Sequence, residues 1–178
     1  MSTKHLLKAA VIAAGVVTLP SFAAAQSTSS GTLTVTATVE SSIGMTFEED
    51  ASGVTLTGAG TNAATMAFGA ISAYNTISTP RVTRTVSASD FTVSSLFGIK
   101  VVKANSSSSS YTLAAALASA DTTNTWRINS TTLMTTNQSL GTSYSYDTTV
   151  AHTVYLTVPL TASTGAVSKV LNFTATAN

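Results

Sequence analysis

Hydrophobic and polar residues alternate strictly over the stretch from Gly31 to Val39, which reads GTLTVTATV. A repeat of two is typical of a β-strand that buries one face and exposes the other. Threonine and valine are both β-branched, which suits the pleated backbone of a strand. We therefore predict a strand here, whose buried row is Leu33, Val35, Ala37 and Val39.

The end of the chain alternates in the same way. Thr153–Val158 and Val170–Ala177 each read as a strand, with Pro159 and a turn near Gly165 between them. The pattern predicts a closing β-hairpin that completes the sheet. Its last strand is expected to bury one row of side chains, namely Leu171, Phe173, Ala175 and Ala177.

Short apolar runs separated by turn residues fill the middle of the chain. The most hydrophobic run, Phe91–Val102, is expected to be a central strand, and Tyr111–Ala120 fits either a helix or a strand, with its neighbours favouring a strand. Turn signals about every 8–12 residues are typical of a sandwich. We predict an all-β, antiparallel β-sandwich, with further strands near 43–47, 53–58, 66–71, 81–86 and 126–133 and loops at 103–110 and 135–141.

The first 25 residues have the features of a secretory signal peptide. Lys4 and Lys8 precede a short apolar run, and three alanines precede Gln26. The apolar run is too short to span a bilayer, and small residues before Gln26 fit a cleavage site. We expect residues 1–25 to be removed and residues 26–178 to form a single sandwich domain with no membrane span, located in the periplasm, at the bacterial cell surface or outside the cell.

Composition narrows the classes of function. Only 8% of the residues are charged, with 8 basic and 7 acidic side chains, and there is no cysteine. The chain therefore has no basic patch for nucleic acid and no disulfide to hold an exported fold. A surface rich in hydroxyls and poor in charge suits a wall, coat or filament protein, although ordinary compositional variation among secreted proteins gives the same numbers.

Residues that could carry chemistry are sparse. His152 is the only histidine after residue 25 and is expected on the solvated face of its strand. The acidic run Glu48–Asp50 could begin a calcium site but lacks the alternating pattern of a calcium loop, so a solvated turn is favoured. The scattered Asp90, Asp121 and Asp147 are expected to serve turns rather than a catalytic pair. We predict no catalytic residue, no metal site and no cofactor.

The aromatic residues leave two interpretations open. They could form a flat sugar-binding platform, or they could pack in the core of a sandwich, which is the favoured interpretation. The residues concerned are Trp126, Tyr111, Tyr144, Tyr146 and Tyr155.

Three short segments resemble bacterial fimbrial subunits and the secreted proteins similar to spore coat protein U. These are Met66–Ile71 (MAFGAI), Tyr111–Leu113, and the final pair Val154–Pro159 and Phe173–Thr176. The resemblance implies an immunoglobulin-like sandwich that is exported, in which the N-terminal strand of one subunit can complete the sheet of the next. The chain departs from that family in having no cysteine and in ending Ala-Asn.

Together these patterns predict a structural cell-surface protein, a fimbrial, filament or coat subunit that assembles by strand pairing. Its partners would be copies of itself and a periplasmic chaperone. The strand 31–39 could pair with its own sheet, beside the C-terminal strand, or with the sheet of a neighbouring copy. The alternative function is a secreted carbohydrate-binding or adhesive module.

Cleavage of the signal peptide can be checked directly. We expect N-terminal sequencing of the exported protein to begin at Gln26, because the small residues before it fit the cleavage site. A sequence that begins at Met1 or Ser2 in the exported material would contradict this expectation.

Overall fold

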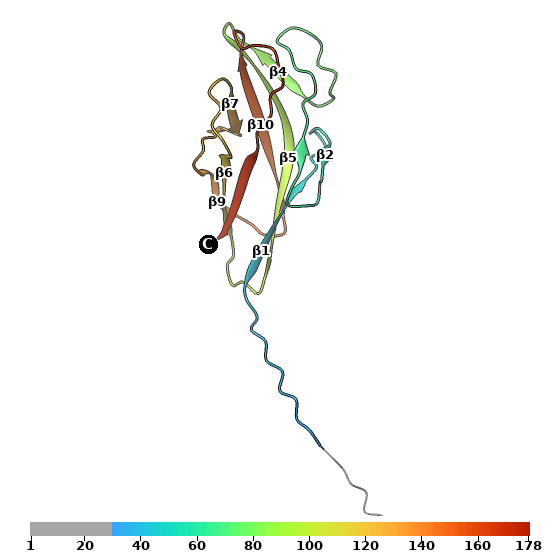
Figure 1. Ribbon diagram of the computed structural model, residues 1–178, viewed down its shortest axis with the longest axis vertical. Coiled ribbons are helices and arrows are strands. Elements are labelled where there is room, and N and C mark those ends of the chain that lie inside the picture. Colours follow the sequence, from blue (N-terminus) through green and yellow to red (C-terminus); the bar gives the residue numbers. More distant parts are fainter. Residues whose placement is uncertain (1–29) are drawn as a thin grey trace, which may run out of the picture. The chain divides into compact units, whose positions relative to one another are not determined.

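A computed structural model describes residues 30–178 (Figure 1). The chain divides into two units, Met1–Ala37 and Thr38–Asn178. The predicted signal peptide, residues 1–25, lies outside the described residues, as does the cleavage site beside Gln26.

All regular structure between residues 30 and 178 is β, in eleven strands with antiparallel pairing throughout. The all-β prediction is therefore confirmed, and the alanine-rich run after Tyr111 is a strand rather than a helix. The strands are β1 (Ser42–Glu48), β2 (Leu56–Thr57), β3 (Thr65–Met66), β4 (Thr83–Val86), β5 (Asp90–Ala104), β6 (Tyr111–Leu117), β7 (Thr125–Ile128), β8 (Thr131–Thr132), β9 (Gln138–Tyr144), β10 (Thr149–Pro159) and β11 (Leu171–Ala177).

The larger sheet has the order β1-β5-β10-β7-β8, and β4 pairs with β5 as a sixth strand. The fifteen-residue β5 lies at its centre, as its hydrophobic sequence predicts. One edge of β5 carries β4 on its first half and β1 on its second half, and the other edge carries β10 along eleven residue pairs. This strand therefore sets the register of most of the sheet.

A second sheet of three strands has the order β11-β6-β9. The predicted closing hairpin is therefore wrong, since β10 lies in the large sheet and β11 in the small one. The residues between Pro159 and Leu171 carry the chain from one sheet to the other, a connection that a period of two cannot distinguish from a hairpin. The predicted inward row of β11 is correct for Leu171, Phe173 and Ala175, which are half-buried, whereas Ala177 is exposed.

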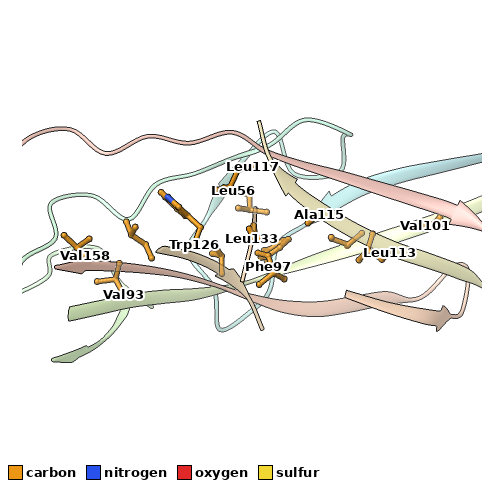
Figure 2. Close-up of a cluster of buried hydrophobic side chains, with 14 of the residues drawn as sticks. Leu56, Val93, Phe97, Val101, Leu113, Ala115, Leu117, Trp126, Leu133 and Val158 are labelled. Atoms are coloured by element: carbon orange, nitrogen blue, oxygen red, sulfur yellow. The ribbon is translucent and has the colours of Figure 1, made fainter. Parts of the chain in front are cut away.

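Side chains from both sheets meet in one hydrophobic core (Figure 2). The large sheet contributes Phe97 and Ile99 from β5 and Trp126 from β7, and the small sheet contributes Leu113 and Leu117 from β6. Two sheets that share one apolar core make a β-sandwich.

Two stretches differ from the pattern-based prediction. Of the expected strand 66–71 only Met66 lies in a strand, as the second residue of β3, and Gly69 has a special conformation three residues later. Its φ is +69°, and a Cβ atom at this position would lie 2.2 Å from Thr79 Oγ1, so the chain turns and approaches Thr79 closely. The expected loop 135–141 instead contains the start of β9, where polar side chains hid the strand.

The predicted strand 31–39 is not a strand in the described structure. Residues 30–41 belong to no sheet. Alternation specifies two faces, but a strand is stable only when a neighbouring strand supplies hydrogen bonds and the apolar face is covered.

The core can be tested at Leu113, which is fully buried on β6. We expect Leu113→Ala to lower the free energy of unfolding by about 2–5 kcal/mol, because the lost methyl groups leave a cavity. The exposed Thr174 on β11 gives the control, since Thr174→Ala should change the free energy of unfolding by about 0.5 kcal/mol or less. Urea unfolding of both variants measures the difference, and equal losses would contradict the assigned faces.

Candidate functional site: the open seam between β1 and β11

The small sheet ends in β11 on one side and in β9 on the other, and the outer edge of β11 has no partner strand. β11 is the end strand of its sheet, with β6 on its other side. Val170 O accepts a hydrogen bond from Ala118 N, and Asn178 N donates to Ser110 O, so the even-numbered residues of β11 point their backbone groups towards β6. The N–H and C=O groups of Leu171, Phe173, Ala175 and Ala177 therefore point to the free edge.

The edge of the large sheet nearest to β11 is formed by β1. Phe47 O accepts a hydrogen bond from Gly60 N, and Phe47 N donates to Thr61 O. The edge of β1 at Phe47 is therefore already bonded to the following loop. Because backbone groups alternate along a strand, Ile43 and Met45 point theirs to the same edge. β1 and β11 lie close together but are not paired with each other. We call the gap between these two edges the seam.

The seam is apolar and incompletely covered. Ile43, Met45 and Phe47 on β1 and Leu171 and Phe173 on β11 pack against the core, yet all five stay half-buried. A groove of about 980 Å³ runs along this side of the molecule, between residues 62–71 and residues 165–173. Its floor is Phe97, Trp126, Ile128, Val154 and Leu156 of the large sheet.

Aromatic rings line the middle of the seam. Phe173 lies edge-on to Phe47 and to Phe97, with centroid distances of 5.3 Å and 5.8 Å. Phe47 and Phe97 are themselves 6.4 Å apart. Edge-to-face contacts of this kind add about 0.5–1.5 kcal/mol to the burial of the rings, so they hold β11 against the large sheet without any backbone pairing.

The predicted strand-pairing residues fall into two groups. Leu171, Phe173 and Ala175 lie at the seam, whereas the apolar row in the segment 31–39 is exposed, with Leu33 at 85%, Val35 at 80% and Val39 at 74%. Ala37 is exposed as well. The structure therefore contains a sheet edge without a strand and a strand-like segment without a sheet.

His152 was predicted on the solvated face of β10, and this is wrong. It is 1% exposed and lies on the same inward face as Val154, Leu156 and Val158, whose spacing in the sequence could have revealed it. Its ring packs at 5.9 Å from both Phe97 and Tyr144. Burial lowers the pKa of His152 below its usual value, which favours the neutral imidazole.

A cluster of three tyrosines lies beyond His152. Tyr111 stacks obliquely on Tyr144 and on Tyr146, at 5.5 Å and 5.3 Å. Burial raises the pKa of the Tyr111 and Tyr144 phenols, with the neighbouring tyrosines adding to the effect at Tyr111. Both hydroxyls are therefore neutral across the ordinary pH range and act as parts of the core rather than as general bases.

The acidic residues serve local hydrogen bonds. In the run 48–50, Glu48 accepts from Thr46 Oγ1, Glu49 from Leu56 N, and Asp50 from Ser52 N. The three carboxylates thus bond separately to β1, to β2 and to the turn between these strands. Between residues 30 and 178, no group of three or more His, Asp or Glu side chains could hold a metal ion.

Asp121 closes the turn before β7. Its carboxylate accepts hydrogen bonds from Trp126 Nε1 at 2.9 Å, from Asn124 N at 2.9 Å and from Thr123 N at 3.1 Å. Partial burial opposes ionisation, but these donors outweigh it and lower the pKa of Asp121 to about 2. The residue holds the indole ring in the core and performs the turn role that the sequence suggested.

Most of the aromatic set belongs to the core, as the favoured interpretation of the sequence expects. Trp126, Tyr111 and Tyr146 are buried in the core, and Tyr144 packs against them. Only Tyr155 of this set lies on the outer face of the large sheet, where Arg127 stacks 4.8 Å from its ring centroid.

No family model, no curated protein and no solved structure matches this chain. Within the described residues, no helix is long and apolar enough to cross a membrane.

The free edge of β11 predicts an alternating pattern of hydrogen exchange. In dilute protein, we expect the amides of Phe173 and Ala175 to exchange rapidly, because they point away from β6. The amides of Asn172, Thr174 and Thr176 should be protected by their bonds to β6. Amide exchange followed by NMR gives the measurement, and uniform protection along β11 would show that its edge is covered.

Proposed function

We propose that this protein is an exported structural subunit of a bacterial cell-surface fimbria, filament or coat. In the proposed assembly, the seam of each copy receives the segment 31–39 of the next copy. The observation that carries the proposal is the combination of a free edge on β11 with an exposed, strictly alternating segment in the same chain. The immunoglobulin-like relationship to fimbrial subunits is part of this proposal.

The chemistry of the two parts is complementary. The seam offers unpaired backbone groups and half-buried apolar side chains, whereas the segment offers nine residues with an apolar row on one face. An inserted strand can hydrogen-bond to the edge of β11 and can cover Phe47 and Phe173 with that row. Strand addition of this kind derives affinity from the main chain and specificity from alternate side chains.

Insertion into the neighbour is favoured over insertion into the same chain. The segment ends at Val39, and β1 begins at Ser42, so self-insertion beside β1 would need a hairpin turn at Glu40-Ser41. Two-residue hairpin turns need positive φ angles, which favour asparagine and glycine. Glu40-Ser41 has neither, and a neighbouring copy avoids this turn altogether.

A structural role also fits the composition and the buried titratable groups. Low charge and many hydroxyls suit surfaces that pack against neighbours, and His152 and the tyrosine cluster are enclosed in the core. We propose that the protein is not an enzyme and binds no cofactor. A periplasmic chaperone that covers the seam before assembly is part of the same proposal, because an open apolar edge is prone to wrong pairing.

The proposal predicts that the mature protein, beginning at Gln26, forms multimers whose size grows with concentration and which resist detergent. Val35→Asp should abolish them, because it would place a carboxylate on the row that is buried in the seam. Thr36→Asp gives the matched control, since its side chain points from the opposite face and the multimers should remain. Size-exclusion chromatography over a wide concentration range, followed by electrophoresis in detergent, measures both effects.

A strictly monomeric wild-type protein at every concentration would overturn the assembly. Equal loss of multimers in Val35→Asp and Thr36→Asp would overturn the assignment of the buried row. In a seam that has been filled, the amides of Phe173 and Ala175 should gain protection from exchange, which locates the contact on β11.

A further inference from the structure

The turn between β7 and β8 is joined to β10 by a single asparagine. Asn129 N donates to Thr153 O at 2.8 Å, and Thr153 N donates to Asn129 Oδ1 at 2.9 Å. Asn129 Nδ2 lies 3.1 Å from His152 Nδ1. Asn129 has a φ of +52°, a conformation that asparagine and aspartate adopt more readily than other non-glycine residues.

These bonds fix the protonation state of the imidazole. The backbone N–H of Thr153 can only donate, so the amide atom facing it must be the oxygen, and the amide nitrogen must face His152. That nitrogen donates, so Nδ1 must be an unprotonated acceptor and the ring proton must sit on Nε2. The described side chains and backbone give buried Nε2 no hydrogen-bond partner, so no neighbour compensates for a charged ring.

We propose that Asn129 and His152 form an acid-sensitive latch, which holds the β7–β8 turn on β10 at neutral pH and releases it when His152 takes up a proton. A proton from solvent on Nδ1 would face the amide hydrogens of Asn129, which removes that hydrogen bond. Rotation of the amide would satisfy the charged ring but would turn the NH₂ group towards the N–H of Thr153. Either way one of the latch bonds is lost.

The neighbours of the ring do not offset the charge. Phe97 packs from β5 and is apolar. Tyr144 packs from β9, and its hydroxyl already donates to Leu140 O at 2.8 Å. The phenol of Tyr144 is neutral below its raised pKa. Neither ring therefore carries a negative charge that could pair with an imidazolium.

The direction of the pH effect follows from the buried neutral state. The pKa of His152 is lowered in the fold, so the stability that the latch contributes is complete above the unfolded value of about 6.5. It is lost as the pH falls below that value, until the folded pKa is reached. Asp121 acts in a different pH range. The stability that its lowered pKa contributes is lost only as the pH falls from about 3.8 to about 2.

The experiment follows individual amides of the mature protein by NMR between pH 7.5 and pH 5. We expect the protection factors of Asn129 and Thr153 to fall by up to about tenfold per pH unit below about pH 6.5, as uptake of one proton requires. The ring nitrogen shifts at pH 7.5 should report a proton on Nε2.

The variant Asn129→Asp should reverse the direction in which stability depends on pH. A carboxylate at this position can accept from both Thr153 N–H and a protonated Nδ1, so it should raise the pKa of His152. Urea midpoints should then fall as the pH rises through that raised value, whereas those of the wild type fall as the pH drops.

Three results would overturn the latch. The first is constant protection of Asn129 and Thr153 from pH 7.5 to pH 5. The second is a proton on Nδ1 at neutral pH, and the third is an Asn129→Asp profile with the same slope as the wild type. If this variant does not fold, the amide and ring measurements on the wild type decide the question alone.

Discussion

The requirement that backbone hydrogen-bonding groups find partners governs this fold at its edges. Along β5 the requirement is met on both sides, by β1 and β4 on one edge and β10 on the other. At β11 it is met on one side only, and four residues direct N–H and C=O groups to an unpaired edge. Protein sheets usually shorten, charge or cover such edges, because an exposed edge recruits other strands. Here the edge is seven residues long, uncharged and bordered by an apolar groove.

The two sides of the sandwich are closed in different ways. Near β8 and β9 the sheets are joined by a polar contact, in which Thr131 Oγ1 donates to Ser139 O at 3.5 Å. Near β1 and β11 the contact consists of aromatic rings, and the rings stay half-buried. The half-buried rings beside the free edge of β11 are the feature on which the proposed role in assembly rests.

The interior carries titratable groups where a minimal core would need none. His152 and Tyr111 are almost fully enclosed, and each has a polar atom without a partner among the described protein groups. Such groups cost free energy, of the order of 1–3 kcal/mol for each unmet hydrogen bond. At His152 the other ring nitrogen is used to orient Asn129, so the cost is linked to a specific contact between the β7–β8 turn and β10. The proposed acid response follows from that link.

Sequence alone determined the class of the fold and the inward faces of its long strands. The run Phe91–Val102 and the alternation at Leu171, Phe173 and Ala175 fix which side chains turn inward, because consecutive strand residues point to opposite faces whatever the partner. Tertiary structure decided which strands are neighbours. The placement of β10 and β11 in different sheets depends on contacts between distant residues, and so does the contact of Asn129 with His152. Alternation is a property of one strand, whereas pairing depends on which edges the rest of the chain leaves free.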